Sequence, residues 1–122
     1  MFFPASGWFV AFVLTLAIEV PVAAYLLRRA EPDRLRLVVL VVFANLATHP
    51  IVWYVITQPF LIGTWEYILA AEAWAVGAEA VFYAVAFRGL GPRRAIAVAV
   101  VANAASFVVG WVAGELWPGV FG

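Results

Sequence analysis

The chain has 122 residues, of which 67% are apolar and only 11% are charged, and its seven basic and seven acidic residues balance to a net charge of zero. A water-soluble domain of this size would lack the polar residues to cover its own surface, because such domains are nearer half apolar and a quarter charged. The composition also excludes a disordered tail and leaves no basic tract for nucleic acid. Without cysteine there is neither a disulfide framework nor a thiolate metal site. We therefore expect an integral membrane protein whose first partner is the lipid bilayer.

Ionisable residues and turn formers divide the chain into four long apolar segments, over residues 8–27, 37–56, 65–87 and 95–116. Each has about the 20 residues with which a helix crosses the hydrocarbon core, and only a helix satisfies the backbone of a single segment in lipid. The run Met1-Phe2-Phe3-Pro4 has no basic residue, unlike a secretory signal, so we expect the first span to be retained. The predicted fold is all-α: a polytopic membrane protein with four transmembrane helices in a single transmembrane domain over residues 1–122.

The basic residues indicate the orientation. All seven are arginines, and they lie in two short segments, 28–36 and 88–94. By the positive-inside rule both segments are cytoplasmic, which leaves both termini and the segment 57–66 outside. We expect a multi-pass protein of a bacterial cytoplasmic (inner) membrane. Five tryptophans fit the outer interface, where indole rings collect: Trp8, Trp53, Trp65, Trp111 and Trp117.

The chain also repeats itself. Glu19 and Glu79 each precede an arginine by nine residues, and Asn45 and Asn103 each follow an arginine by nine. These are the chain's only two asparagines, and each is followed by a hydroxyl residue after three positions and by a tryptophan after eight. The spacing predicts two duplicated out–in–out hairpins, over about 8–56 and 65–116, related by a pseudo-two-fold axis along the membrane normal.

Nine helical residues place these acids and amides about 13–14 Å from the cytoplasmic boundary, close to the bilayer midplane. A carboxyl group there is costly, so it should face the bundle interior, and function is its default interpretation. Two carboxyls in a low dielectric cannot easily both ionise, so a proton, a cation or polar side chains must accompany them. The predicted proton-, cation- or ligand-binding residues are Glu19, Glu79, Asn45, Asn103, Glu72 and His49, with Thr48 and Ser106 as supporting residues.

Two prolines inside the apolar segments predict interrupted helices. Pro21 follows Glu19 by two residues and Pro50 follows His49 directly. Proline removes a backbone donor, so the carbonyl four residues earlier needs another partner. Interrupted helices beside buried acids are a common frame for midplane ion sites. On the last span, a small-residue stripe predicts close helix approach: Ser106, Gly110 and Gly114.

His49 is the chain's only histidine. Together with Glu72 and Glu79 it could supply three ligands to a metal ion, whose sites commonly use three or four. A single histidine without a ligand-spacing motif equally serves as a buried polar group. The sequence therefore leaves the cofactor unknown, with these three residues as the candidate metal ligands.

Three resemblances bear on family. The run Asn45-Leu46-Ala47-Thr48-His49-Pro50, with the paired acids at 72 and 79 and the run Asn103-Ala104-Ala105-Ser106, resembles a family of short, uncharacterised bacterial inner-membrane proteins over most of the chain. That resemblance implies no known activity. Small multidrug-resistance transporters are similar in length, span number and first-span acid, within Leu16-Ala17-Ile18-Glu19-Val20, but the rest of their pattern is not evident. Fluoride channels share the length and the Asn-x-x-Ser-Phe run at 103–107, but their pore motif is missing and buried carboxylates suit an anion path poorly.

These residues support three hypotheses of function. The favoured one is proton- or cation-coupled transport, or small-ligand binding, at Glu19 and Glu79. The alternatives are an intramembrane enzyme that uses His49, Glu72 and Glu79, with or without a metal, on a lipid-borne substrate, and an accessory or scaffold subunit of a membrane complex. No nucleophile elbow or phosphate loop supports other catalysis, so catalytic residues stay unknown. A water-filled cavity reaching the acids from outside would favour a carrier or an enzyme over a scaffold. Four spans enclose little volume, so a transporter of this size would work as a homodimer.

Overall fold

The computed structural model describes residues 5–59 and 64–117, without the side chains of residues 5–8 and Trp53. The described chain is all-α, as predicted. Its elements are α1 (Ala5–Leu27), α2 (Arg34–Pro50), the π-helical segment η1 (Ile51–Val55), α3 (Trp65–Ala86) and α4 (Pro92–Leu116). Three of the helices, α1, α3 and α4, are long and apolar enough to cross a membrane. The shorter α2 has 17 residues and is continued directly by the five residues of η1.

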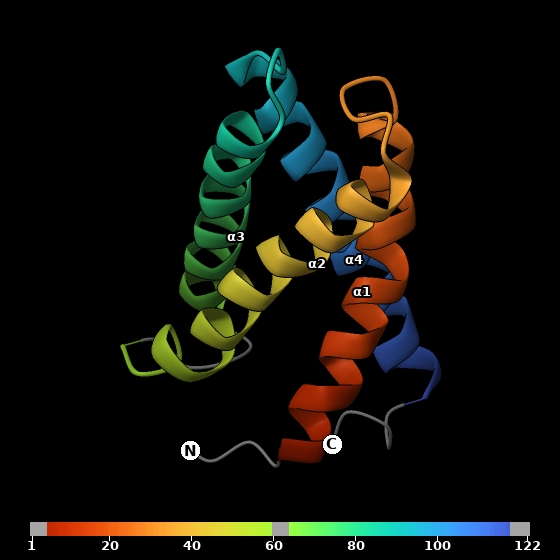
Figure 1. Cartoon of the computed structure of the whole chain (residues 1–122). Helices are drawn as coiled ribbons and strands as arrows, with labels where there is room; N and C mark the ends of the chain where they lie inside the picture. Colours follow the sequence, from red (N-terminus) through yellow and green to blue (C-terminus); the bar gives the residue numbers. More distant parts are fainter. Residues whose placement is uncertain (1–4, 60–63, 118–122) are drawn as a thin grey trace.

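The four helices form a ring in which α1 and α3 lie diagonally opposite each other. Each of these two packs against both α2 and α4. Both arginine-containing connections lie at one end of the bundle, at the top of Figure 1, while α1 begins and α4 ends at the other. α2 runs obliquely, from beside α1 at the arginine end to beside α3 at the opposite end (Figure 1).

Local sequence signals explain where the helices begin. Asp33 caps α2 by accepting hydrogen bonds from the backbone N–H groups of Leu35 and Arg36, at 3.1 and 3.2 Å. Thr64 caps α3 by accepting from the N–H of Tyr67 at 3.3 Å. α4 begins at Pro92, where the missing N–H is not needed.

The two prolines behave differently. α1 continues through Pro21 to Leu27, so the predicted interruption of the first helix is wrong. Transmembrane helices tolerate such a proline where the surroundings satisfy the released carbonyl. At Pro50 the regular helix does end, and the wider π-helical turn of η1 follows.

Two side chains of α3 bond to carbonyl groups on either side of this change in helix type. The Trp74 indole N–H donates to the carbonyl of Thr48, and the Tyr67 hydroxyl donates to the carbonyl of Val52, both at 3.3 Å. These bonds compensate for the disturbed backbone pattern and hold α2 and η1 against α3.

An apolar core closes the half of the bundle nearest the arginines. Leu27, Tyr83 and Phe87 are completely buried there, and the Tyr83 and Phe87 rings lie 5.9 Å apart. Small and branched residues of α2 and α4, such as Val41 and Ala99, fill the space between them. This packing separates the polar residues deeper in the bundle from the arginine end.

The outward face of the bundle is apolar on every helix. Large side chains are exposed along its flanks, among them Phe9 on α1, Phe43 on α2, Val85 on α3 and Val108 on α4. In water this surface would be strongly unfavourable, whereas lipid chains solvate it well. The chain is therefore a multi-pass helical membrane protein.

Two predictions about this outward surface can be compared with the structure. Trp65, Trp111 and Trp117 are exposed, as interfacial residues would be, while the side chains of Trp8 and Trp53 lie outside the described part. Among the described residues, a side-chain carbon at Gly110 or Gly114 would meet nothing within 4 Å. The predicted glycine stripe therefore does not bring α4 close to another helix of the same chain, and that prediction is wrong within the chain.

Candidate functional site

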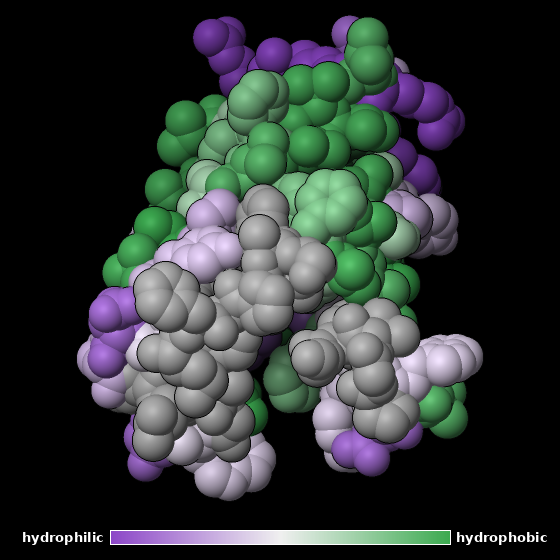
Figure 2. All heavy atoms as spheres, turned by 90° about the horizontal axis from the view of Figure 1, so that it is seen from below, coloured by the Kyte–Doolittle hydropathy of each residue, from purple (hydrophilic) through white to green (hydrophobic). Residues whose placement is uncertain are grey.

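A polar cavity of about 200 Å³ lies in the half of the bundle away from the arginines. Residues from all four helices line it, and Figure 2 shows the molecule hollowed at this end. Every residue that the sequence nominates for the site contributes to its wall: Glu19, Asn45, Thr48, His49, Glu72, Glu79, Asn103 and Ser106. The structure thus brings together residues that lie up to 87 positions apart in the sequence.

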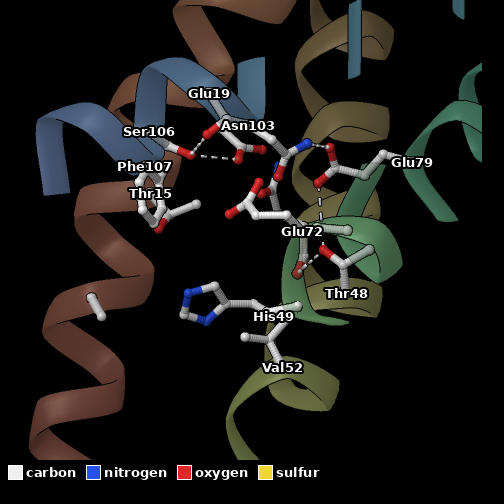
Figure 3. Close-up of a pocket in the computed structure, with 14 residues that line it drawn as sticks. Thr15, Glu19, Thr48, His49, Val52, Glu72, Glu79, Asn103, Ser106 and Phe107 are labelled. Carbon is white, nitrogen blue, oxygen red and sulfur yellow. Dashed lines mark hydrogen bonds between the residues drawn. The ribbon is translucent and has the colours of Figure 1, made fainter. Parts of the chain in front are cut away.

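Glu79 lies at the inner end of this cavity and is only 1% exposed. One of its oxygens, Oε2, accepts a hydrogen bond from the Asn103 amide, and the other, Oε1, accepts from the Thr48 hydroxyl at 3.4 Å. Asn103 uses its second amide hydrogen on the carbonyl of Ala99, at 2.8 Å. Both oxygens of the Glu79 carboxyl therefore have donors (Figure 3).

Glu19 is equally buried, at 1% exposure, but its two oxygens differ. Oε1 accepts from the Ser106 hydroxyl at 2.9 Å, whereas Oε2 is buried and has no hydrogen-bond partner among the described residues. Asn45 and Glu79 are also immediate neighbours of this carboxyl. The site thus holds two adjacent carboxyl groups, and no arginine is among the described residues that line the cavity.

Contacts in the two predicted hairpins correspond. Asn45 donates to the carbonyl of Val41 at 3.0 Å, just as Asn103 donates to that of Ala99. The Thr48 and Ser106 hydroxyls each lie within hydrogen-bond distance of the carbonyl of the asparagine three residues earlier. Each hydroxyl also reaches the carboxyl group of the other hairpin. The polar network therefore joins the two halves of the chain.

Each of these hydroxyl groups can serve two protonation states of the carboxyl it faces. A hydroxyl has one hydrogen and two lone pairs. Ser106 can donate to Glu19 when that carboxyl is charged, or donate to the Asn103 carbonyl and accept from a protonated Glu19, and both distances are about 3 Å. The Thr48 hydroxyl has the same choice, since the Asn45 carbonyl oxygen and Glu79 Oε1 each lie 3.4 Å from it. By turning, the two hydroxyl groups can thus keep these hydrogen bonds whether the carboxyl they face is charged or protonated.

The outer part of the cavity is less symmetric. The half-buried Glu72 carboxyl points into it between the paired acids and His49 (Figure 3). The His49 ring packs against Phe12 with centroids 5.1 Å apart. Thr15 and Phe107 line the cavity near its α1 and α4 walls (Figure 3). Phe107 was not predicted, because its position directly after Ser106 is the only hint that the sequence offers.

The suggested metal ligands do not form a set. Within residues 5–59 and 64–117, no three histidine, aspartate or glutamate side chains are gathered closely enough to hold a metal ion. The helical spacing of Glu72 and Glu79 places both on the cavity wall but seven residues apart along α3, which is about 10 Å. The geometry of the described residues therefore lends no support to a three-ligand site of His49, Glu72 and Glu79, which stays a prediction.

Comparisons with protein-family models, with curated proteins and with solved structures find no match to this chain. The resemblance to short bacterial inner-membrane proteins stays a prediction. The chain's own geometry identifies it as a multi-pass helical membrane protein with a buried polar network of Glu19, Glu79, Asn103 and Thr48.

Proposed function

We propose that this protein binds a proton or a small cation at the Glu19–Glu79 pair and carries it across the membrane. The observation on which the proposal rests is the adjacency of two carboxyl groups, each 1% exposed, in a polar cavity whose described lining residues include His49 but no lysine or arginine. Two neighbouring carboxylates without a counterion are unfavourable at low dielectric. A proton or a bound cation is what would neutralise them.

The hydrogen bonds support one exchangeable positive charge on the pair. Glu79 accepts from two donors, which suits a carboxylate. In the described part of the chain Glu19 has a donor on Oε1 and none within hydrogen-bond geometry on Oε2, which suits a proton or a cation shared with Glu79. The turning hydroxyls of Ser106 and Thr48 would then follow each exchange at little cost.

The same proposal includes four membrane crossings and two equivalent hairpins. α2 with η1 supplies 17 plus five residues, close to the length that a crossing needs. Corresponding contacts of Asn45 and Asn103, and of Thr48 and Ser106, support an internal repeat.

With the arginines cytoplasmic, the cavity faces outward and the apolar core around Tyr83 and Phe87 closes the inner side. Release inside would require the two hairpins to rock about the paired acids, as parallel repeats do in other carriers.

The decisive experiment measures ion flux into liposomes that contain the purified protein. A pH gradient or a sodium or potassium gradient is imposed, and internal pH and cation uptake are followed. Glu19→Gln and Glu79→Gln should each lower the flux at least 100-fold, because an amide keeps the shape but cannot exchange the charge. Glu66→Gln is the matched control, since this glutamate is exposed at the start of α3 and lies outside the cavity wall. If folded Glu19→Gln and Glu79→Gln proteins keep the full flux, the proposal is wrong.

A further inference from the structure

An apolar groove of about 460 Å³ adjoins the polar cavity on the outer half of the bundle. It lies between α3 and α4 and is lined by Trp65, Ile68, Phe107 and Trp111. Phe107 lines the polar cavity as well. A single phenyl ring therefore belongs to the walls of an acidic cavity and of an apolar groove.

The groove is placed where a lipid-like chain can reach it. Trp65 and Trp111 are 76% and 64% exposed, on the apolar outward face that the bilayer would cover. Tryptophan at this depth marks the level of the headgroups, with hydrocarbon beside it. A molecule that lies along the groove would thus have an apolar part in lipid contact and one end at Phe107.

The opposite flank of the cavity, between α1 and α2, is closed differently. The position that corresponds to Phe107 in the repeat is His49, and its ring packs against Phe12. The position that corresponds to Phe12 is Glu72, whose carboxyl points into the cavity (Figure 3). The first hairpin therefore closes its flank with a pair of rings, and the second has a single ring and an acid.

We propose that the ligand of this site is a membrane-borne amphiphile with a protonated amine head, which enters between α3 and α4 past Phe107. The head would sit among Glu72, Glu19 and Glu79, and the hydrocarbon chain would lie in the groove against Trp65, Ile68 and Trp111. Charge complementarity selects a cationic head, because the described lining of the cavity offers three acids against a single histidine and no lysine or arginine. This inference rests on the proposed function and adds the chemical class of the cation and its route.

The test compares dodecylammonium with ethylammonium, using the full chain in phosphatidylcholine nanodiscs and isothermal titration calorimetry. The Glu19→Gln/Glu79→Gln protein in the same nanodiscs corrects for partitioning into lipid. After this correction dodecylammonium should still bind about tenfold more tightly than ethylammonium, because only its chain packs against the groove. Dodecyl sulfate, which has the same chain with a negative head, should not bind.

Groove variants separate this inference from the proposed function. Trp111→Ala should lower the affinity for dodecylammonium at least tenfold and leave ethylammonium binding unchanged. Trp117→Ala, an exposed tryptophan at the same end that is not part of the groove, should change neither.

Equal affinity for the two amines, or a chain preference that survives Trp111→Ala, would overturn the amphiphile while the cation site stands. A dimer that dissociates on Trp111→Ala, without a chain preference, would mean that a second copy covers the groove. If neither amine binds and Glu19→Gln leaves ion flux intact, the proposed function itself fails.

Discussion

At the scale of single residues, the site depends on how Glu19 and Glu79 are hydrogen-bonded. Each carboxyl takes its hydroxyl donor from the other hairpin, through Ser106 and Thr48 respectively. In the proposed function, a proton that moves between the carboxyls would therefore change hydrogen bonds that join the two halves of the chain. Such bonds to charged groups are worth about 1.5–3 kcal/mol, enough to bias two arrangements of the hairpins.

Removing one hydroxyl should therefore slow the proposed transport without unfolding the protein. We expect Ser106→Ala to reduce the proton or cation flux about tenfold, since the Glu19 carboxylate would lose its donor at 2.9 Å. Ser106→Thr should restore the flux, because threonine occupies the corresponding position 48. The flux is measured in liposomes that contain the unchanged protein, Ser106→Ala or Ser106→Thr. Equal flux in all three would show that the hydroxyl is only a packing contact.

At the scale of helices, sequence patterns located the elements well and their interruptions less well. Apolar length predicted α1, α3 and α4 to within a few residues, because a lipid-facing helix must be apolar all along. The prediction that a proline interrupts its helix is confirmed at Pro50 and wrong at Pro21. Whether a proline ends a helix depends on what the neighbouring helices offer the disturbed backbone. At Pro50, the Trp74 and Tyr67 side chains that bond to nearby carbonyls come from a distant part of the chain. No local pattern reveals that.

The start of α2 offers a direct test of a local signal. Asp33 accepts from two backbone N–H groups at the first turn of α2. Asp33→Ala should lower the free energy of unfolding by about 1 kcal/mol, whereas Asp33→Asn should change it by only a few tenths, because asparagine caps nearly as well. Unfolding of the detergent-solubilised protein, followed by circular dichroism during titration with sodium dodecyl sulfate, measures the difference. Equal loss in both variants would assign the effect to the charge rather than to the cap.

At the scale of the whole molecule, the sequence identified the polar side chains of the site but not its apolar walls. Rare residues in a lipid-soluble chain stand out, so Glu19, Glu79 and the two asparagines could be found by their types and spacing alone. Phe107 could not, since aromatic residues are frequent here and only the packing of four helices decides that its ring lines the cavity while the Tyr83 ring lies in the apolar core. The glycine stripe failed for the same reason: small residues permit close approach, but they do not supply a partner helix.

The orientation of the molecule in the membrane decides from which side a ligand reaches the cavity. All arginines lie at one end of the bundle (Figure 1), so that end should be cytoplasmic. The chain has no cysteine, which allows single-cysteine labelling without background. In right-side-out membrane vesicles, a membrane-impermeant maleimide should label Gln58→Cys at once and Pro32→Cys only after permeabilisation, since both positions are exposed but lie at opposite ends of α2 with η1. Labelling of both variants from one side would mean that α2 and η1 lie along the interface without crossing. The reverse pattern would place the cavity on the cytoplasmic side, and the acids would then load their cation from within the cell.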